Sequence, residues 1–232
     1  TMTGRERITR ALRFEQTDRP PHFEIMFELE QEAFGLRFPQ RDSWDGCSAR
    51  QKQRKIHECI DVYARIIERF RWDALAVYWP WSDPDGVAAA VEAFGDRILI
   101  GSMVGHSIWA IESVSDWMQF SIDLHEHPER LHEEAERRCA AALDRIDRLM
   151  DAGADFINLV NDVAGNDGPF IAPQKFAELV TPYLARQVAR IRERGGFAWV
   201  HSDGMLMPVL DQLLSTGMHV LQGIDPMAGM DI

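Results

Sequence analysis

The stretch FAWVHSDG, residues 197–204, carries the strongest structural signal in the chain. Its apolar start follows the pair Gly195 and Gly196, as expected of a buried strand that begins after a turn. The strand ends in His201 and Asp203, which are two residues apart and therefore project from the same face of an extended chain. Parallel β/α sheets and barrels carry their active sites at the carboxyl ends of strands. The stretch therefore predicts an α/β protein with a site at this strand end.

Apolar strands and amphipathic helices alternate on either side of this stretch, which predicts a parallel sheet with right-handed crossovers. The other expected strands are residues 22–27, 73–79, 96–105, 154–162 and 219–226. The expected helices are an opening helix capped by Thr3 and Glu6, then 49–70, 87–94, 128–152, 173–194 with a bend near Pro182, and 206–215.

These elements predict a TIM-type (β/α)₈ barrel in a single domain over residues 1–232. A closed barrel needs eight strands, and an open one would expose apolar strand edges. We therefore expect the barrel to be truncated after about its sixth strand, with the C-terminal units missing.

The composition excludes several classes of protein. At 232 residues and 46% hydrophobic content, the chain can bury a large core. It has neither an apolar run of ~20 residues nor a signal peptide, so we expect a cytoplasmic protein. The net charge of −12 argues against nucleic-acid binding. The cysteines Cys47, Cys59 and Cys139 form no CxxC motif and are expected to be reduced thiols.

Further candidate residues lie on or after the other strands. Asn161 and Asp162 end the 154–162 strand, which makes its tip polar as well. Glu24 lies on the expected first strand, where it is either a site residue inside a barrel or a solvated charge. Trp79 and Trp81 either line a flat pocket wall or pack in the core.

Four of the candidate residues also have a purely structural explanation. His106 and Glu112 follow the 96–105 strand, and each either enters a site or lies at the surface. The pair His201 and Asp203 could itself be a hydrogen-bonded strand end without a chemical role.

Three segments carry a family resemblance: TGRERITRALRFEQTDRPP (3–21), DLHEHPERLHEEAERR…PYLARQ (123–187) and WVHSDGMLMPVLDQLLSTGMHVLQGID (199–225). Together they resemble the uroporphyrinogen decarboxylase superfamily. That TIM-barrel family also contains cobalamin-dependent methyltransferases that act on thiols such as coenzyme M. The resemblance implies an enzyme with its site at the strand ends.

The decarboxylase branch of the superfamily carries an MRQAGR segment near the first strand and an aspartate after the second. This chain has HFEIMFELEQ (22–31), without arginine, at the first place, and VYWPWSD (77–83) at the second. Pro80 falls near the aspartate position, and Asp83 or Asp85 could substitute for it. The carboxylates of a porphyrinogen would then be poorly paired, which favours the other branch.

The methyltransferase branch has a zinc-binding HxC pair after its fifth strand, and here the matching residues are His201, Ser202 and Asp203. Imidazole and carboxylate together are a legitimate ligand set for zinc or another divalent metal. Such a metal would activate a substrate thiol, hydroxyl or water for transfer of a methyl group from a corrinoid or a pterin-linked donor. The carboxylate in place of a thiolate favours oxygen ligands. Asp162 and Asn161 would support the metal or bind substrate.

The resemblance and the residues together predict a metal-assisted methyltransferase with a zinc or other divalent ion and a corrinoid methyl carrier. We expect catalytic roles for His201, Asp203 and Asp162, metal binding by His201 and Asp203, and substrate binding by Glu24, Trp79, Asn161 and Trp81. The alternatives are a decarboxylase of a porphyrinogen or another carboxylated substrate, and a non-catalytic binding barrel. The expected partners are a small-molecule substrate, a corrinoid protein and a second copy in a homodimer, but neither nucleic acid nor a membrane.

Overall fold

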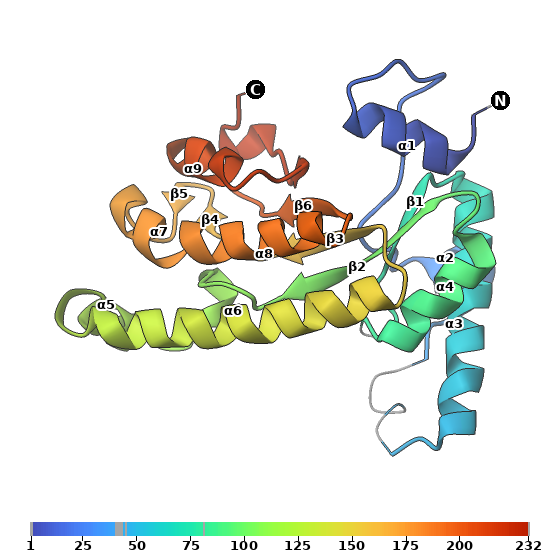
Figure 1. Cartoon of the computed structure of the whole chain (residues 1–232), viewed down its shortest axis with the longest axis horizontal. Helices are drawn as coiled ribbons and strands as arrows, with labels where there is room; N and C mark the ends of the chain where they lie inside the picture. The colour runs from blue at the N-terminus through green and yellow to red at the C-terminus, as the bar shows by residue number, and fades with distance from the viewer. Residues whose placement is uncertain (1, 40–43, 45, 81, 232) are drawn as a thin grey trace. The chain divides into compact units, whose positions relative to one another are not determined.

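The computed structural model describes residues 2–39, 44, 46–80 and 82–231 and has an α/β fold (Figure 1). Five strands form one sheet in the order β1-β2-β3-β6-β7. They are β1 (Ala74–Val77), β2 (Leu99–Gly105), β3 (Phe156–Val160), β6 (Phe197–His201) and β7 (Val220–Gln222). Pairs β1–β2 and β6–β7 are parallel, and His201 lies opposite Gln222. The predicted parallel α/β fold is therefore confirmed, with shorter strands than expected.

The helices follow the predicted order. They are α1 (Gly4–Leu12), α2 (Glu30–Phe34), α3 (Ala49–Phe70), α4 (Pro84–Phe94), α5 (Trp117–Glu126), α6 (Pro128–Asp151), α7 (Pro173–Leu179), α8 (Thr181–Glu193) and α9 (Leu210–Ser215). The sequence patterns did not predict α2, α5 or the short antiparallel hairpin of β4 (Ala164–Gly165) and β5 (Gly168–Pro169). Of the helices in the described part of the chain, none is long and apolar enough to cross a membrane.

The chain divides into two compact units. Unit 1 contains Thr1–Met103 and Arg148–Phe156, and unit 2 contains Val104–Asp147 and Ile157–Ile232.

Local signals explain where two of the helices begin and break. At α1 the Thr3 hydroxyl accepts from the Glu6 amide at 3.1 Å, and the Glu6 carboxylate accepts from the Thr3 amide at 2.8 Å. This is the predicted capping box. The expected 173–194 helix is divided between α7 and α8 at Val180. Pro182 has no amide hydrogen and its ring would collide with the carbonyl four residues earlier, so the predicted bend is confirmed as a break.

The prediction of a first strand at residues 22–27 is wrong, because this segment forms no strand. Pro20 and Pro21 cannot donate backbone hydrogen bonds. Within this segment, His22 is the residue that pairs with Asp73. The His22 carbonyl accepts a hydrogen bond from the Asp73 amide at 2.7 Å. Residues 22–27 alternate between exposed and half-buried although they form no strand, and Glu24 is one of the exposed residues.

A buried carboxylate anchors the N-terminal segment of unit 1 at the start of β1. Asp73 is 1% exposed and accepts from Arg7 at 2.5 Å, from Arg19 at 2.7 and 2.8 Å, and from the His22 amide at 2.8 Å. Arg7, itself 4% exposed, also binds Asp18. Removal of a buried charge from water is costly unless such partners compensate it.

In unit 2, helices α6 and α8 lie side by side (Figure 1). Arg186 binds Glu136 through two bonds of 2.6 and 2.8 Å, and the Tyr183 hydroxyl lies 3.1 Å from His132 Nδ1. Because α6 leads to β3 and α8 leads to β6, this packing supports the two strands whose ends carry the candidate site.

Replacement of Asp73 by alanine should lower the free energy of unfolding by ~3 kcal/mol, because Arg7 would keep a buried charge with one partner fewer. Asp61→Ala, on an exposed position of α3, is the control and should change it by less than ~0.5 kcal/mol. Urea denaturation measures both. Equal stability of the two variants would contradict this account of unit 1.

Candidate metal centre

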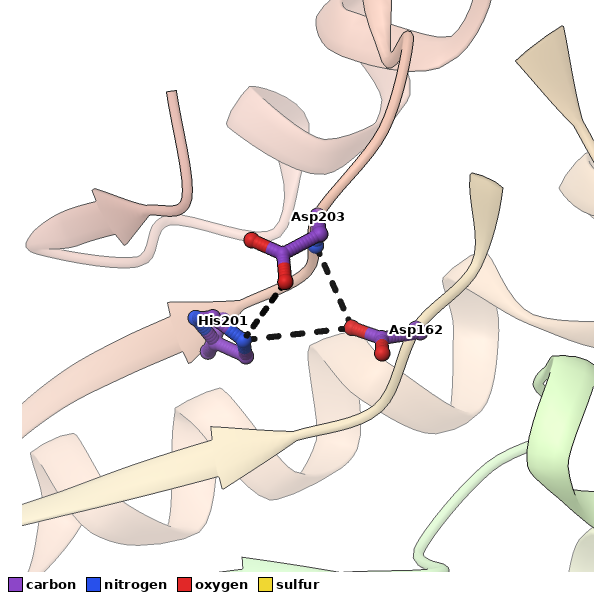
Figure 2. Close-up of side chains that lie close together, drawn as sticks. All are labelled: Asp162, His201 and Asp203. Atoms are coloured by element: carbon purple, nitrogen blue, oxygen red, sulfur yellow. Dashed lines mark hydrogen bonds and ion pairs between the residues drawn. The ribbon is translucent and has the colours of Figure 1, made fainter. Parts of the chain in front are cut away.

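Three side chains converge at the carboxyl ends of β3 and β6 in unit 2 (Figure 2). His201 is the last residue of β6, and its Nε2 atom lies 3.9 Å from Asp162 Oδ1 and 3.9 Å from Asp203 Oδ2. One ligand atom from each residue lies within 4.8 Å of the other two. The structure thus brings the three predicted catalytic residues into one cluster.

Backbone hydrogen bonds hold this cluster together. The Asn161 amide donates to the His201 carbonyl at 3.2 Å, which joins the end of β3 to the end of β6. The Asp203 amide donates to Asp162 Oδ1 at 3.1 Å. The Asp162 carbonyl in turn accepts from the Ile111 amide at 2.8 Å. These bonds orient the Asp162 carboxylate toward His201.

Ser202, between the two candidate ligands, stabilises the strand end through two hydrogen bonds. It is 1% exposed, and its hydroxyl accepts from the Val163 amide at 3.0 Å and donates to the Asp203 carbonyl at 3.0 Å. No role is predicted for Ser202 from the sequence, where its one signal is its position between His201 and Asp203.

Gly223, directly after β7, is a second residue that the sequence analysis missed. Its φ of +95° lies in the left-handed region, and a Cβ atom there would lie 2.3 Å from the Ser202 carbonyl oxygen and 3.1 Å from Asp203 Oδ1. Only glycine therefore lets the end of β7 approach Ser202 and Asp203 this closely.

The cluster is half open and negatively charged. The exposed fraction of the side chain is 16% for His201, 47% for Asp162 and 66% for Asp203. In the described part of the chain, neither carboxylate pairs with a lysine or arginine. Such a cluster attracts a cation, and its imidazole and carboxylate groups are the ligands that zinc and harder divalent ions accept.

The family of the chain follows from its sequence. Residues 85–231, which include the whole cluster, match the family described as uroporphyrinogen decarboxylase (URO-D). The chain belongs to this family. No curated protein sequence matches it.

A solved structure of the "methyltransferase from Methanosarcina mazei" resembles this URO-D family chain with a TM-score of 0.71. The likeness covers 95% of this chain and 76% of that one, and at 13% sequence identity it shows the fold alone.

Two further solved structures are similar over part of their length. They are the Amycolatopsis orientalis BexX/CysO complex (TM-score 0.38, 11% identity, 72% of this chain and 52% of that chain) and the IOLI protein with a bound zinc atom (TM-score 0.43, 10% identity, 69% and 55%). Both TM-scores are below 0.5, so these two likenesses do not indicate a shared fold.

The four predicted substrate-binding residues of this URO-D chain have different surroundings. Asn161 is 3% exposed, and its amide exchanges two hydrogen bonds, of 3.0 and 3.1 Å, with Ser107. It therefore ties the loop after β2 to the end of β3. Glu24 is exposed and Trp79 is half-buried; both belong to unit 1, whereas the cluster belongs to unit 2. Trp81 lies outside the described residues.

The remaining candidates stay outside the cluster. His106 and Glu112 are both exposed, and His106 has a left-handed φ of +55°. Cys59 and Cys139 are buried, reduced thiols, and burial raises the pKa of the Cys59 thiol to about 12.

Gly223→Ala should destabilise this URO-D chain more than Gly195→Ala does. Both glycines have positive φ, but a Cβ atom on Gly195 would meet nothing within 4 Å, so that variant bears the backbone strain of ~1–2 kcal/mol alone. In Gly223→Ala the clash with Ser202 adds to it. Thermal unfolding measures the difference. Equal losses of stability would show that the approach of β7 to Ser202 is not tight.

Proposed function

We propose that this URO-D family chain is a metal-assisted methyltransferase whose ion is held by Asp162, His201 and Asp203. One observation supports the proposal above the others. An imidazole nitrogen lies 3.9 Å from carboxylate oxygens of two different residues, at neighbouring ends of β3 and β6. This is the region of a β/α sheet where catalytic groups gather.

The geometry of the cluster fits a divalent ion. Zinc binds nitrogen and oxygen ligands at ~2.0–2.2 Å in a tetrahedron, so two ligands of one ion lie roughly 3.3–3.6 Å apart. Both nitrogen-to-oxygen distances are 3.9 Å and exceed this separation by less than ~1 Å, a difference that small rotations of the carboxylates close. The two carboxylates are exposed enough to turn inward, and three protein ligands leave a coordination position for substrate, as in catalytic zinc sites.

Side chains of the chain itself would orient the substrate and determine which nucleophile the site prefers. A divalent ion bound here would lower the pKa of a substrate hydroxyl, thiol or water. The Asp203 amide holds Asp162. The His201 side chain is the least exposed of the three, so substrate approaches over the more exposed carboxylates. Asp203 stands where the resembling methyltransferases carry cysteine, and a carboxylate favours oxygen over sulfur nucleophiles.

The methyl donor belongs to the same proposal. We infer a corrinoid or pterin-linked methyl group, delivered by a partner corrinoid protein, to a small-molecule acceptor. A cytoplasmic location, a homodimer and a single functional domain over residues 1–232 remain predictions that accompany it.

The family match over residues 85–231 supports a second candidate, decarboxylation of a carboxylated substrate without a metal. In that reaction His201 and the carboxylates would move protons. Asp162 and Asp203, which no lysine or arginine of the described residues neutralises, repel a substrate that carries carboxylates of its own, so the cluster favours methyl transfer.

The wild-type chain should hold about one zinc or cobalt ion after dialysis against the metal, and His201→Ala should lose it. Removal of a residue that only hydrogen-bonds to a metal ligand weakens metal binding by about 10–100-fold. Removal of the ligand itself should therefore weaken binding at least as much. Elemental analysis and calorimetry measure content and affinity. His106→Ala, an exposed histidine of the same unit, is the control and should keep its ion.

A wild-type chain that binds no divalent ion would contradict the proposal. If that chain instead shifts the absorption spectrum of an added porphyrin, the decarboxylase candidate gains support. If it binds a corrinoid protein and transfers no methyl group, it is a non-catalytic binding barrel.

A further inference from the structure

A buried and a half-buried amide side chain form a bridge across β6. Asn158 on β3 is fully buried, and its Nδ2 donates to Gln222 Oε1 on β7 at 3.1 Å. Strand β6 lies between β3 and β7 in the sheet. The Asn158–Gln222 hydrogen bond therefore spans the width of β6.

The bridge crosses the face from which His201 projects. His201 on β6 pairs with Gln222 on β7, and residues opposite each other in neighbouring strands point to the same side of the sheet. Asn158 reaches Gln222 and so lies on that side too. The amide bridge consequently passes beside the base of the His201 imidazole.

Asn158 Oδ1 and His201 Nδ1 are both buried without a hydrogen-bond partner among the described residues. Buried polar atoms are almost always paired, so each exception needs an explanation. The two atoms are complementary, because an amide oxygen only accepts, whereas Nδ1 donates in one tautomer of neutral imidazole.

We propose that Asn158, held by Gln222, positions His201 by accepting a hydrogen bond from its Nδ1–H once the imidazole turns toward it. This bond selects the tautomer whose Nε2 lone pair faces Asp162 and Asp203. Metal-binding histidines almost always donate their other ring nitrogen in this way. The inference rests on the proposed metal site and adds two positioning residues to it.

The first test needs no metal. Nitrogen-15 NMR of the His201 imidazole, recorded on the metal-free chain, reports which ring nitrogen carries the proton. The wild type should show the Nδ1–H form, and Asn158→Leu should shift it toward Nε2–H. Asn158→Asp keeps an acceptor oxygen, and Gln222 can turn its amide to donate to the new carboxylate, so this variant should retain the Nδ1–H form.

Gln187→Leu is the matched control. Gln187 is also fully buried, donates one amide bond, to the Ser107 carbonyl, and leaves its own oxygen without a partner among the described residues. Gln187→Leu should lower the free energy of unfolding by about as much as Asn158→Leu does, and it should leave the His201 signals unchanged. If Asn158→Leu does not fold, Gln222→Met releases Asn158 from its bridge and should shift the same signals in the same direction.

Zinc affinity is the second readout. Asn158→Leu should raise the dissociation constant about 10–100-fold, with Asn158→Asp and Gln187→Leu close to wild type. An unchanged tautomer in Asn158→Leu, or in Gln222→Met where that variant is used, would overturn the inference. A shifted tautomer in a chain that binds no metal would support the role of Asn158 and refute the proposed metal site, so the two failures are distinguishable.

Discussion

The hydrogen bond from the Asn161 amide to the His201 carbonyl, 3.2 Å long, joins the end of β3 to the end of β6. The candidate site depends on it. Asp162 and His201 are far apart in the sequence, and only the pairing of these two strands brings their side chains to 3.9 Å. The packed helices α6 and α8 lead to the same two strands, so the two layers of unit 2 both support the cluster.

Much of the fold was predictable because its signals are local. The alternation of apolar runs and amphipathic helices predicted the parallel sheet, and Thr3, Glu6 and Pro182 marked a helix start and a helix break that the structure confirms. The failure at residues 22–27 has the opposite cause. The alternation of side chains there matches a strand, but a strand also needs backbone hydrogen-bond partners. The double proline cannot donate such bonds, and His22 is the one residue of this segment that pairs with Asp73.

The site was predictable only in part. The spacing of His201 and Asp203 placed both on one face, and the polar tip at Asp162 indicated a neighbouring strand end. The supporting residues depend instead on which residues face each other across strands, and no local pattern specifies that register. Gly223 beside Asp203, and Asn158 bonded to Gln222, are visible only once β3, β6 and β7 lie next to each other.

The proposed metal centre of this URO-D family chain consists of Asp162, His201 and Asp203, which would bind one divalent ion. Anomalous X-ray diffraction from crystals grown with zinc tests it most directly. We expect one strong peak at ~2.0–2.2 Å from His201 Nε2 and from one oxygen of each carboxylate. Zinc-containing crystals without a peak at this cluster would contradict it.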